Sequence, residues 1–231
     1  MTIEAVVEAA VQYLIGNTDI KPPASELVAA LIAAEKQAKK EKCRYDYADL
    51  LGNWQLKFVS GTKTQKTKTD KSDRPSSRAK PMKTPGAGRY IPQWINVSIT
   101  YDTQASILTP DLIADSVSGR IPSSSSHPNQ LGAVINQVRL NSLSFQLSGP
   151  TLYWPNTNSL GFDFIYFHLS IGNWTLYRAP VRGGMERAQT FADQPLKDQA
   201  FFTFFRVTQD YIAARGKGGG LALWTRADAL A

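Results

Sequence analysis

The stretch from Asp49 to Gly61 reads Asp-Leu-Leu-Gly-Asn-Trp-Gln-Leu-Lys-Phe-Val-Ser-Gly. Its apolar side chains Trp54, Leu56 and Phe58 alternate with Gln55 and Lys57, which is the period-2 pattern of a strand with one buried face. The stretch separates an N-terminal part with helical spacing from a long C-terminal part that keeps the alternating pattern. It therefore predicts the first strand of a mainly β domain.

Further strands are predicted after residue 90. Alternation is clear in residues 95–101 and 143–147, whereas residues 162–169 and 201–207 are apolar on both faces. Proline- and glycine-rich turns separate these runs. We count nine to eleven strands, and closing them into an antiparallel β-barrel would remove the exposed edges.

Two helices are predicted before the first strand. Residues 2–15 carry apolar side chains at helical spacing, and a second helix follows Pro22-Pro23 and ends in a charged run. We therefore expect a helical segment, residues 1–48, that packs on a barrel domain, residues 49–231.

The net charge of +7 lies in one segment. Residues 61–89 hold nine lysine or arginine residues and two aspartates, so the remainder of the chain is neutral overall. This composition predicts a flexible basic loop. Elsewhere, Cys43 is the only cysteine, which excludes an intrachain disulfide. No stretch has the length of a membrane-spanning helix, and we expect neither a secretory signal nor a transit peptide.

A structural latch is predicted between the first and last strands, which are neighbours in a closed barrel. The sequence Gly52-x-Trp54 opens the first strand, and Arg215 and Arg226 lie in the last predicted hairpin. A guanidinium over the Trp54 indole would add a cation–π contact of about 0.5–2 kcal/mol. The alternative is that Trp54 is only a core residue.

These two ends resemble a known family, the plastid-lipid-associated proteins or fibrillins. Two leading helices followed by Asp-Leu-Leu-Gly-Asn-Trp-Gln-Leu are similar to the opening of that family, and residues 209–226 are similar to its closing pattern. The matching positions of the closing pattern are Asp210, Arg215, Gly216, Gly220 and Arg226. The chain departs from the family in Trp224, in the run Gly218-Gly219-Gly220, in its long basic insert and in the missing transit peptide, and this last feature resembles a cyanobacterial member.

The resemblance implies a lipocalin-like antiparallel β-barrel with two N-terminal helices and an apolar ligand such as a lipid, a quinone or a carotenoid. It also implies action at thylakoid membranes or lipid bodies, with peripheral attachment to thylakoids on the cytoplasmic or stromal side. The fold analogy alone does not establish this function. Independently, the alternating strands supply an apolar interior with room for one small ligand. The expected lining residues are Trp54, Leu56, Phe58, Phe145, Phe164, Tyr166, Phe202 and Phe204. A fully packed core is the alternative, and the protein would then be a scaffold or assembly factor for a photosynthetic membrane complex.

Catalysis has little support in the sequence. One cysteine, Cys43, and two distant histidines, His127 and His168, cannot build a typical zinc site. Neither a Gly-x-Ser-x-Gly elbow nor a phosphate loop is present in the sequence. The Gly216–Gly220 run connects two strands and is typical of a hairpin turn. We therefore predict a binding protein with no metal and no catalytic residues.

The basic segment has three interpretations: a solvated spacer, a contact with anionic lipid headgroups, or a nucleic-acid site. It contains no aromatic side chain before Tyr90 for base stacking, so lipid is favoured and no nucleic-acid partner is expected. The predicted membrane-contact residues are Lys63, Lys66, Lys68, Lys71, Lys80, Lys83 and Trp94.

Overall fold

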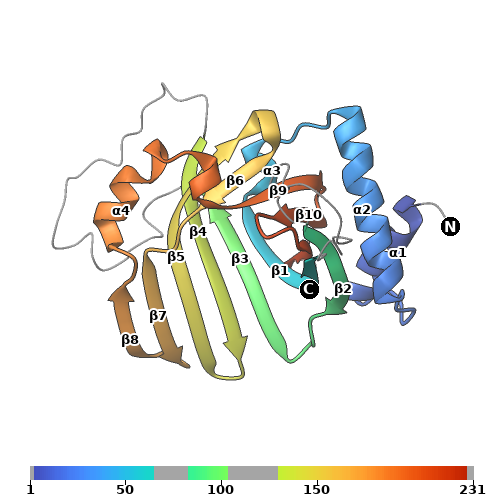
Figure 1. Cartoon of the computed structure of the whole chain (residues 1–231). Coiled ribbons are helices and arrows are strands. Elements are labelled where there is room, and N and C mark those ends of the chain that lie inside the picture. Colours follow the sequence, from blue (N-terminus) through green and yellow to red (C-terminus); the bar gives the residue numbers. More distant parts are fainter. Residues whose placement is uncertain (1–2, 65–82, 104–129, 228–231) are drawn as a thin grey trace, which may run out of the picture.

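The computed structural model describes residues 3–64, 83–103 and 130–227 (Figure 1). The helices within these ranges are α1 (Ile3–Leu14), α2 (Ala24–Glu41), α3 (Tyr47–Leu50) and α4 (Gly184–Thr190), with 3-10 turns at Pro155–Thr157, Phe191–Asp193 and Leu196–Asp198. The strands are β1 (Gly52–Thr64), β2 (Lys83–Tyr90), β3 (Ile95–Asp102), β4 (Gln130–Leu140), β5 (Leu143–Trp154), β6 (Ser159–Phe162), β7 (Tyr166–Ile171), β8 (Trp174–Pro180), β9 (Ala200–Val207), β10 (Tyr211–Gly216) and β11 (Leu221–Arg226).

Eight antiparallel strands close into a barrel, as the alternating sequence predicts. The ring runs β4-β3-β1-β11-β10-β9-β6-β5, and the pairing of β5 with β4 closes it. β7 and β8 continue the sheet beyond β5 outside the ring, and β2 pairs with the far part of β1. The first and last strands are neighbours, with Trp54 opposite Arg226.

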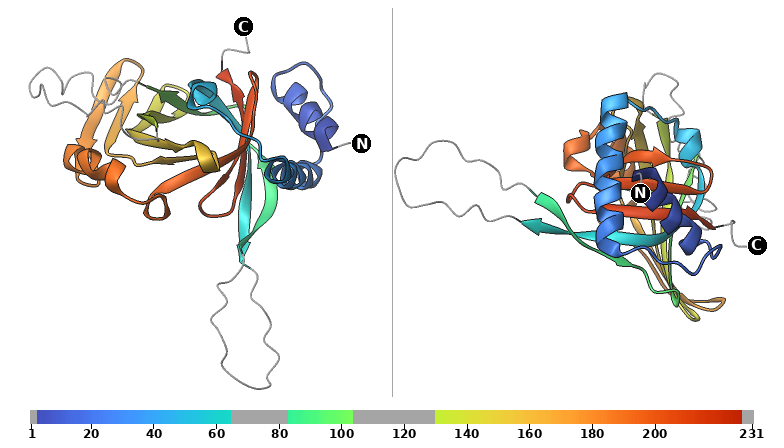
Figure 2. Two further views of the ribbon diagram at one scale, coloured as in Figure 1. Left: turned by 90° about the horizontal axis from the view of Figure 1, so that it is seen from above. Right: turned by 90° about the vertical axis from the view of Figure 1, so that its right-hand side faces the viewer.

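The molecule has two apolar cores, one on each side of the wall formed by β1, β11, β10 and β9. The barrel core lies inside the ring and includes large aromatic side chains that are almost fully buried: Tyr47, Trp54, Tyr101, Tyr153 and Phe204. The helix-side core lies under α1 and α2 and includes Val7, Val11, Leu27, Leu31, Phe58 and Phe205. The helices therefore cover one side of the barrel, while β7, β8 and α4 lie at the opposite side (Figure 2).

The expected boundary at residue 48 falls inside α3. Tyr47 and Leu50 from this short helix belong to the barrel core, and the Tyr47 hydroxyl lies 3.0 Å from the Thr151 Oγ1 atom of β5. The helical segment therefore ends before α3, which is part of the barrel.

Part of the flexible loop predicted over residues 61–89 is strand. Residues 61–64 and 83–89 belong to β1 and β2, which pair from Phe58–Tyr90 to Thr64–Lys83. Strand β1 leaves β3 after Gln55, and pairing with β2 satisfies the backbone groups of its exposed extension. Lys66, Lys68, Lys71 and Lys80 lie outside the described residues, whereas Lys63 and Lys83 are at strand ends.

Candidate functional site

The sheet forks at β5, and this fork creates the candidate site. The first half of β5 pairs with β7, from Leu143–Ile171 to Ser148–Tyr166, while its last residues pair with β6. Between β6 and β7 the chain crosses Gly149, where a Cβ atom would lie 1.8 Å from the carbonyl oxygen of Asp163. Only glycine permits this close approach, so Gly149 marks the point where the barrel ends and an open sheet of β3, β4, β5, β7 and β8 continues.

One face of this open sheet is apolar. Residues that pair directly across strands point to the same face, so the register defines rows of side chains. The end row consists of Ile95, Leu140, Leu143, Ile171 and Trp174, and the next row consists of Val97, Val138, Phe145, Leu169 and Tyr177. A third row contains Ile99, Asn136, Leu147, Phe167 and Ala179. We call these three rows the open apolar face.

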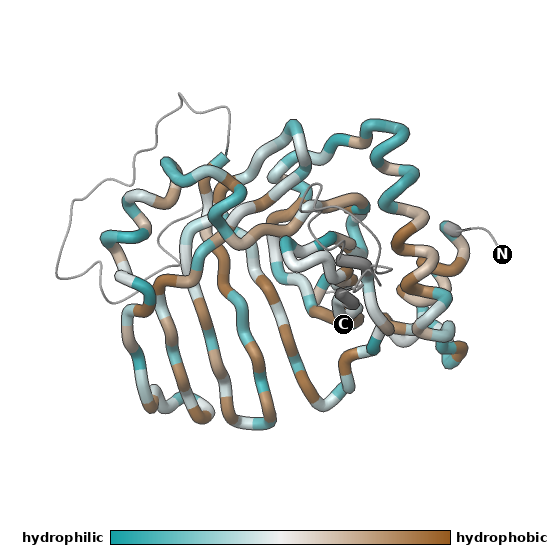
Figure 3. Tube along the Cα trace, viewed as in Figure 1, coloured by the Kyte–Doolittle hydropathy of each residue, from teal (hydrophilic) through white to brown (hydrophobic). Residues whose placement is uncertain are grey.

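The opposite face is polar. Its corresponding rows are Asn96, Arg139, Ser144, Ser170 and Thr175, and Ser98, Gln137, Gln146, His168 and Arg178. The resulting alternation of hydrophobic and hydrophilic residues is visible along the strands in Figure 3. Such a sheet normally buries its apolar face against another layer.

The open apolar face is continuous with the barrel interior and is only partly covered. Ile99 belongs to both its third row and the barrel core, whereas Phe145, Leu147, Phe167 and Leu169 remain partly exposed. The barrel core contributes a neighbouring group of rings, in which Phe162 lies 5.3 Å from both Phe164 and Phe202, centroid to centroid. These rings and the open face form one apolar surface.

The other end of the barrel is closed. Trp54 is 0% exposed, its Nε1 donates a hydrogen bond of 2.7 Å to the Leu50 carbonyl, and the Arg226 guanidinium lies 4.1 Å from its ring centroid. Gly52 has φ +115°, and a Cβ atom there would lie 2.8 Å from Arg226 Nη1. Arg226 therefore takes the predicted place over Trp54, whereas Arg215 is engaged with Glu35 of α2 instead.

The predicted lining residues separate into three groups. Trp54 and Phe204 are buried in the barrel core, with Leu56, Phe164 and Phe202 partly buried beside them, and Phe145 lies on the open apolar face. Phe58 was expected inside but lies in the helix-side core, because a β-bulge between Leu56 and Phe58 inverts the alternation.

Tyr166 was also expected inside, and it lies on the polar face. It pairs with Ser148, whose neighbours Gln146 and Ser144 face the same way. Residues 163–165 are not in a strand. The alternation predicted from Phe164 to Tyr166 is therefore interrupted, and the two side chains do not share a face. Phe167 takes the inward position, and its signal was the alternation of Phe167, Leu169 and Ile171 within β7.

One buried hydroxyl in the barrel core lacks a partner. The Tyr101 side chain is almost fully buried, and its hydroxyl makes no hydrogen bond among the described residues. Burial and the nearby Tyr47 raise the pKa of Tyr101 far above its ordinary value of 10.0. By contrast, the Tyr153 hydroxyl donates a 2.7 Å hydrogen bond to the Tyr45 carbonyl.

This contrast predicts different effects of removing the two hydroxyls. Tyr101→Phe deletes an unsatisfied buried polar group and is expected to leave the free energy of unfolding unchanged or to raise it by up to about 1 kcal/mol. Tyr153→Phe removes a made hydrogen bond and is expected to cost about 1–2 kcal/mol. Urea denaturation of both variants measures the difference, and equal losses would show that the Tyr101 hydroxyl has a partner in solution.

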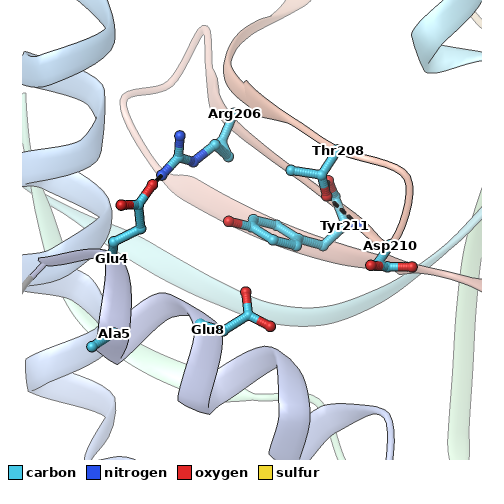
Figure 4. Close-up of a pocket in the computed structure, with 7 residues that line it drawn as sticks. All are labelled: Glu4, Ala5, Glu8, Arg206, Thr208, Asp210 and Tyr211. Atoms are coloured by element: carbon cyan, nitrogen blue, oxygen red, sulfur yellow. Dashed lines mark hydrogen bonds and ion pairs between the residues drawn. The ribbon is translucent and has the colours of Figure 1, made fainter.

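A second surface feature lies between α1 and the β9–β10 turn. This groove has a volume of about 480 Å³ and is lined by Glu4, Ala5, Glu8, Arg206, Thr208, Asp210 and Tyr211. Figure 4 shows these side chains. Arg206 forms an ion pair with Glu4 across the groove, and Thr208 Oγ1 accepts a hydrogen bond from the Tyr211 backbone amide. The ion pair attaches α1 to the barrel, and the hydrogen bond fixes the β9–β10 turn.

The titratable groups have structural contacts. His168 Nε2 lies 3.0 Å from Thr175 Oγ1 on the polar face, and partial burial together with Arg178 lowers its pKa. The buried Asp163 carboxylate is paired with Arg182 and Arg187 and attaches α4 beside the fork. Among the described residues, no group of three or more histidine, cysteine, aspartate or glutamate residues is arranged to hold a metal ion. His127 lies outside the described residues.

Comparison of the chain with protein-family models, with curated proteins and with solved structures finds no match. The fibrillin assignment therefore remains a prediction from the motifs at the two ends of the chain. Within the described part of the chain, no helix combines the length and apolar character needed to cross a bilayer.

Proposed function

We infer that this protein binds a small apolar molecule and does not transform it. The observation that carries the inference is the open apolar face, which continues the barrel interior and remains partly exposed. Monomeric proteins rarely leave a large contiguous apolar surface uncovered unless a ligand or partner covers it. The ligand class is a lipid, a quinone or a carotenoid.

The two ends of the barrel have different roles in this proposal. The closed end, with Trp54 under Arg226 and the buried Tyr47, Tyr101 and Tyr153, is densely filled by side chains. The ligand therefore lies at the open end, between the rings of Phe164 and Phe202 and the open apolar face. Covering about 200 Å² of apolar surface there would contribute about 5 kcal/mol before the entropic cost of binding.

Peripheral attachment to thylakoids is part of the proposal and rests on the fibrillin resemblance. An anionic lipid surface is the expected partner of the basic segment. The described part of that segment is the paired arm of β1 and β2, which extends away from the barrel (Figure 2). The lysines expected to contact lipid lie mainly outside the described residues.

A scaffold or assembly factor for a photosynthetic membrane complex is the second candidate. The filled closed end of the barrel favours it, because a protein that only presents surfaces to partners needs no cavity. In that case a protein segment would cover the open apolar face, and the face would take up no small molecule.

A pair of matched variants distinguishes these candidates. Phe145 and Leu169 are directly paired on the open apolar face, while Gln146 and His168 are directly paired on the polar face of the same strands. The double variant Phe145→Ser/Leu169→Ser is expected to weaken binding of diphenylhexatriene by about tenfold or more, because it removes two apolar contacts. Gln146→Ser/His168→Ser is expected to bind like wild type.

Probe fluorescence titrations measure this difference, and thermal unfolding of both variants checks that the fold is retained. If the wild-type protein takes up no probe, or if both double variants bind equally well, the open apolar face is not the ligand site. A wild-type protein that takes up no probe even after a bound protein partner has been removed would support the scaffold function.

A further inference from the structure

The end row of the open apolar face and Trp94, which directly precedes β3, form an exposed apolar edge, which we call the rim. It consists of Trp94, Ile95, Leu140, Leu143, Ile171 and Trp174. Trp174 is 79% exposed, Trp94 is 70% exposed and Ile171 is 46% exposed. The rim lies at the end of β3 opposite to Tyr101, and it is therefore the end of the barrel away from the Trp54 latch.

The two hairpins at the rim are short and uncharged. The β4–β5 turn consists of Asn141 and Ser142, and the β7–β8 turn consists of Gly172 and Asn173. Asn141 and Gly172 both have φ 53°, which suits tight hairpin turns. Because the turns are so short, the apolar row ends at the very edge of the molecule without a charged loop beyond it.

Acidic side chains are absent from this part of the chain. Residues 91–101, 130–154 and 165–181 contain no aspartate or glutamate, and their only lysine or arginine residues are Arg139 and Arg178. Both arginines belong to the polar face: Arg139 lies in the row next to the rim, and Arg178 lies two rows further along the strands. The rim thus combines exposed tryptophans, an apolar row and nearby cations, and it carries no anion that an anionic headgroup would repel.

We propose that the rim inserts into the interface of a lipid bilayer and that the open apolar face takes up its ligand from there. Tryptophan is enriched at membrane interfaces because its ring is apolar and its N–H is polar. With Trp94 and Trp174 at headgroup depth, Arg139 and Arg178 contact phosphates, and the apolar rows provide a continuous path to the barrel. The transfer step rests on the proposed function, whereas the insertion of the rim does not.

A lipid surface explains these features better than a second copy of the chain. Two copies packing their open apolar faces together would bury the rows behind the rim. They would not require Trp94 on the turn before β3, Trp174 at the start of β8, or the lack of acids in residues 91–101, 130–154 and 165–181. Attachment through the rim also differs from attachment through the basic segment, because apolar insertion is not screened by salt.

The test uses the full chain and vesicles of phosphatidylcholine and phosphatidylglycerol, with one set carrying brominated acyl chains. The expected result is binding that persists at high salt, with quenching of tryptophan fluorescence by bromine. Trp94→Ser/Trp174→Ser is expected to lower the vesicle partition coefficient by about tenfold or more. Trp94→Phe/Trp174→Phe is expected to keep binding and lose most of the quenching, because Trp54 and Trp224 are buried in the protein and Trp154 lies at the end of β5 away from the rim.

Three results would overturn the proposal. One is wild-type protein that fails to bind vesicles, and another is binding that high salt abolishes and the Ser variant leaves intact, which would assign attachment to the basic segment. The third is a concentration-dependent dimer, measured by light scattering without vesicles, that the Ser variant dissociates. Diphenylhexatriene binding in solution is measured in parallel and depends on Phe145 and Leu169, so failure of the rim and failure of the ligand site are distinguishable.

Discussion

Replacing Trp54 by alanine is expected to lower the free energy of unfolding by about 3–5 kcal/mol. The indole is completely buried, so its removal leaves a large cavity at the closed end of the barrel. The change also removes the hydrogen bond to the Leu50 carbonyl and the surface on which the Arg226 guanidinium lies. Arg226 keeps its backbone contacts with Gln209 and Leu51, which limits the loss to this range.

Urea denaturation measures this loss, and the melting temperature should fall by about 2–4 °C for each kcal/mol in a chain of this size. Trp174→Ala is the control, because this side chain is 79% exposed and its removal should change stability by less than about 0.5 kcal/mol. An unchanged melting temperature for Trp54→Ala would refute the latch between the first and last strands.

Replacing Glu35 by alanine is expected to cost about 3 kcal/mol, at the lower end of the range for breaking a buried ion pair. Glu35 is 6% exposed, and both of its carboxylate oxygens accept hydrogen bonds of 2.9 Å from Arg215 Nε. Lys39 adds a contact of 2.8 Å. The pair holds α2 against the β10–β11 hairpin, where Arg215 Nη1 also donates to the Gly219 carbonyl.

The Glu35 contribution should depend on pH. Burial alone would raise the pKa of Glu35, but the hydrogen bonds and charges of Arg215 and Lys39 outweigh it and leave the pKa below its ordinary value of 4.5. A carboxyl group with a lowered pKa in the folded state stabilises the fold above its unfolded pKa, and this stability is lost as the pH falls through the folded pKa. Wild type should therefore lose stability below pH 4.5 more steeply than Glu35→Gln.

Glu4→Ala provides the matched control for Glu35→Ala. Glu4 also pairs with an arginine of the barrel, Arg206, but its side chain is 73% exposed. Exposed ion pairs contribute about 0–1 kcal/mol. If Glu35→Ala lowered the free energy of unfolding by no more than Glu4→Ala does, the contact between α2 and β10 would not contribute significantly to stability.

The strands and their closure could be predicted from sequence, because the signal is local alternation. Trp54, Ile99 and Phe204 follow it and lie in the barrel core. The contact of Arg226 with Trp54 could also be predicted, because closure makes the first and last strands neighbours. The resemblance could point to Arg215 as a residue of interest, but not to its partner, because Glu35 lies far away in the sequence.

The errors come from short local interruptions of the alternation. One bulge after Leu56 moves Phe58 to the helix side, and the break over residues 163–165 moves Tyr166 to the polar face. A one-residue shift inverts every following side chain, and no local composition marks these positions. The fork at Gly149 could not be predicted either, because it depends on two strands, β6 and β7, that share β5 as a neighbour.

The uptake of one apolar molecule by the open face is tested most directly by native mass spectrometry of the protein purified gently from its own host. We expect a population of the wild-type protein that carries one small apolar molecule. Phe145→Ser/Leu169→Ser should lose this added mass, and Gln146→Ser/His168→Ser should keep it. A wild-type chain without any added small molecule would contradict the proposed binding function. The same molecule retained by both double variants would show that the open apolar face does not hold it.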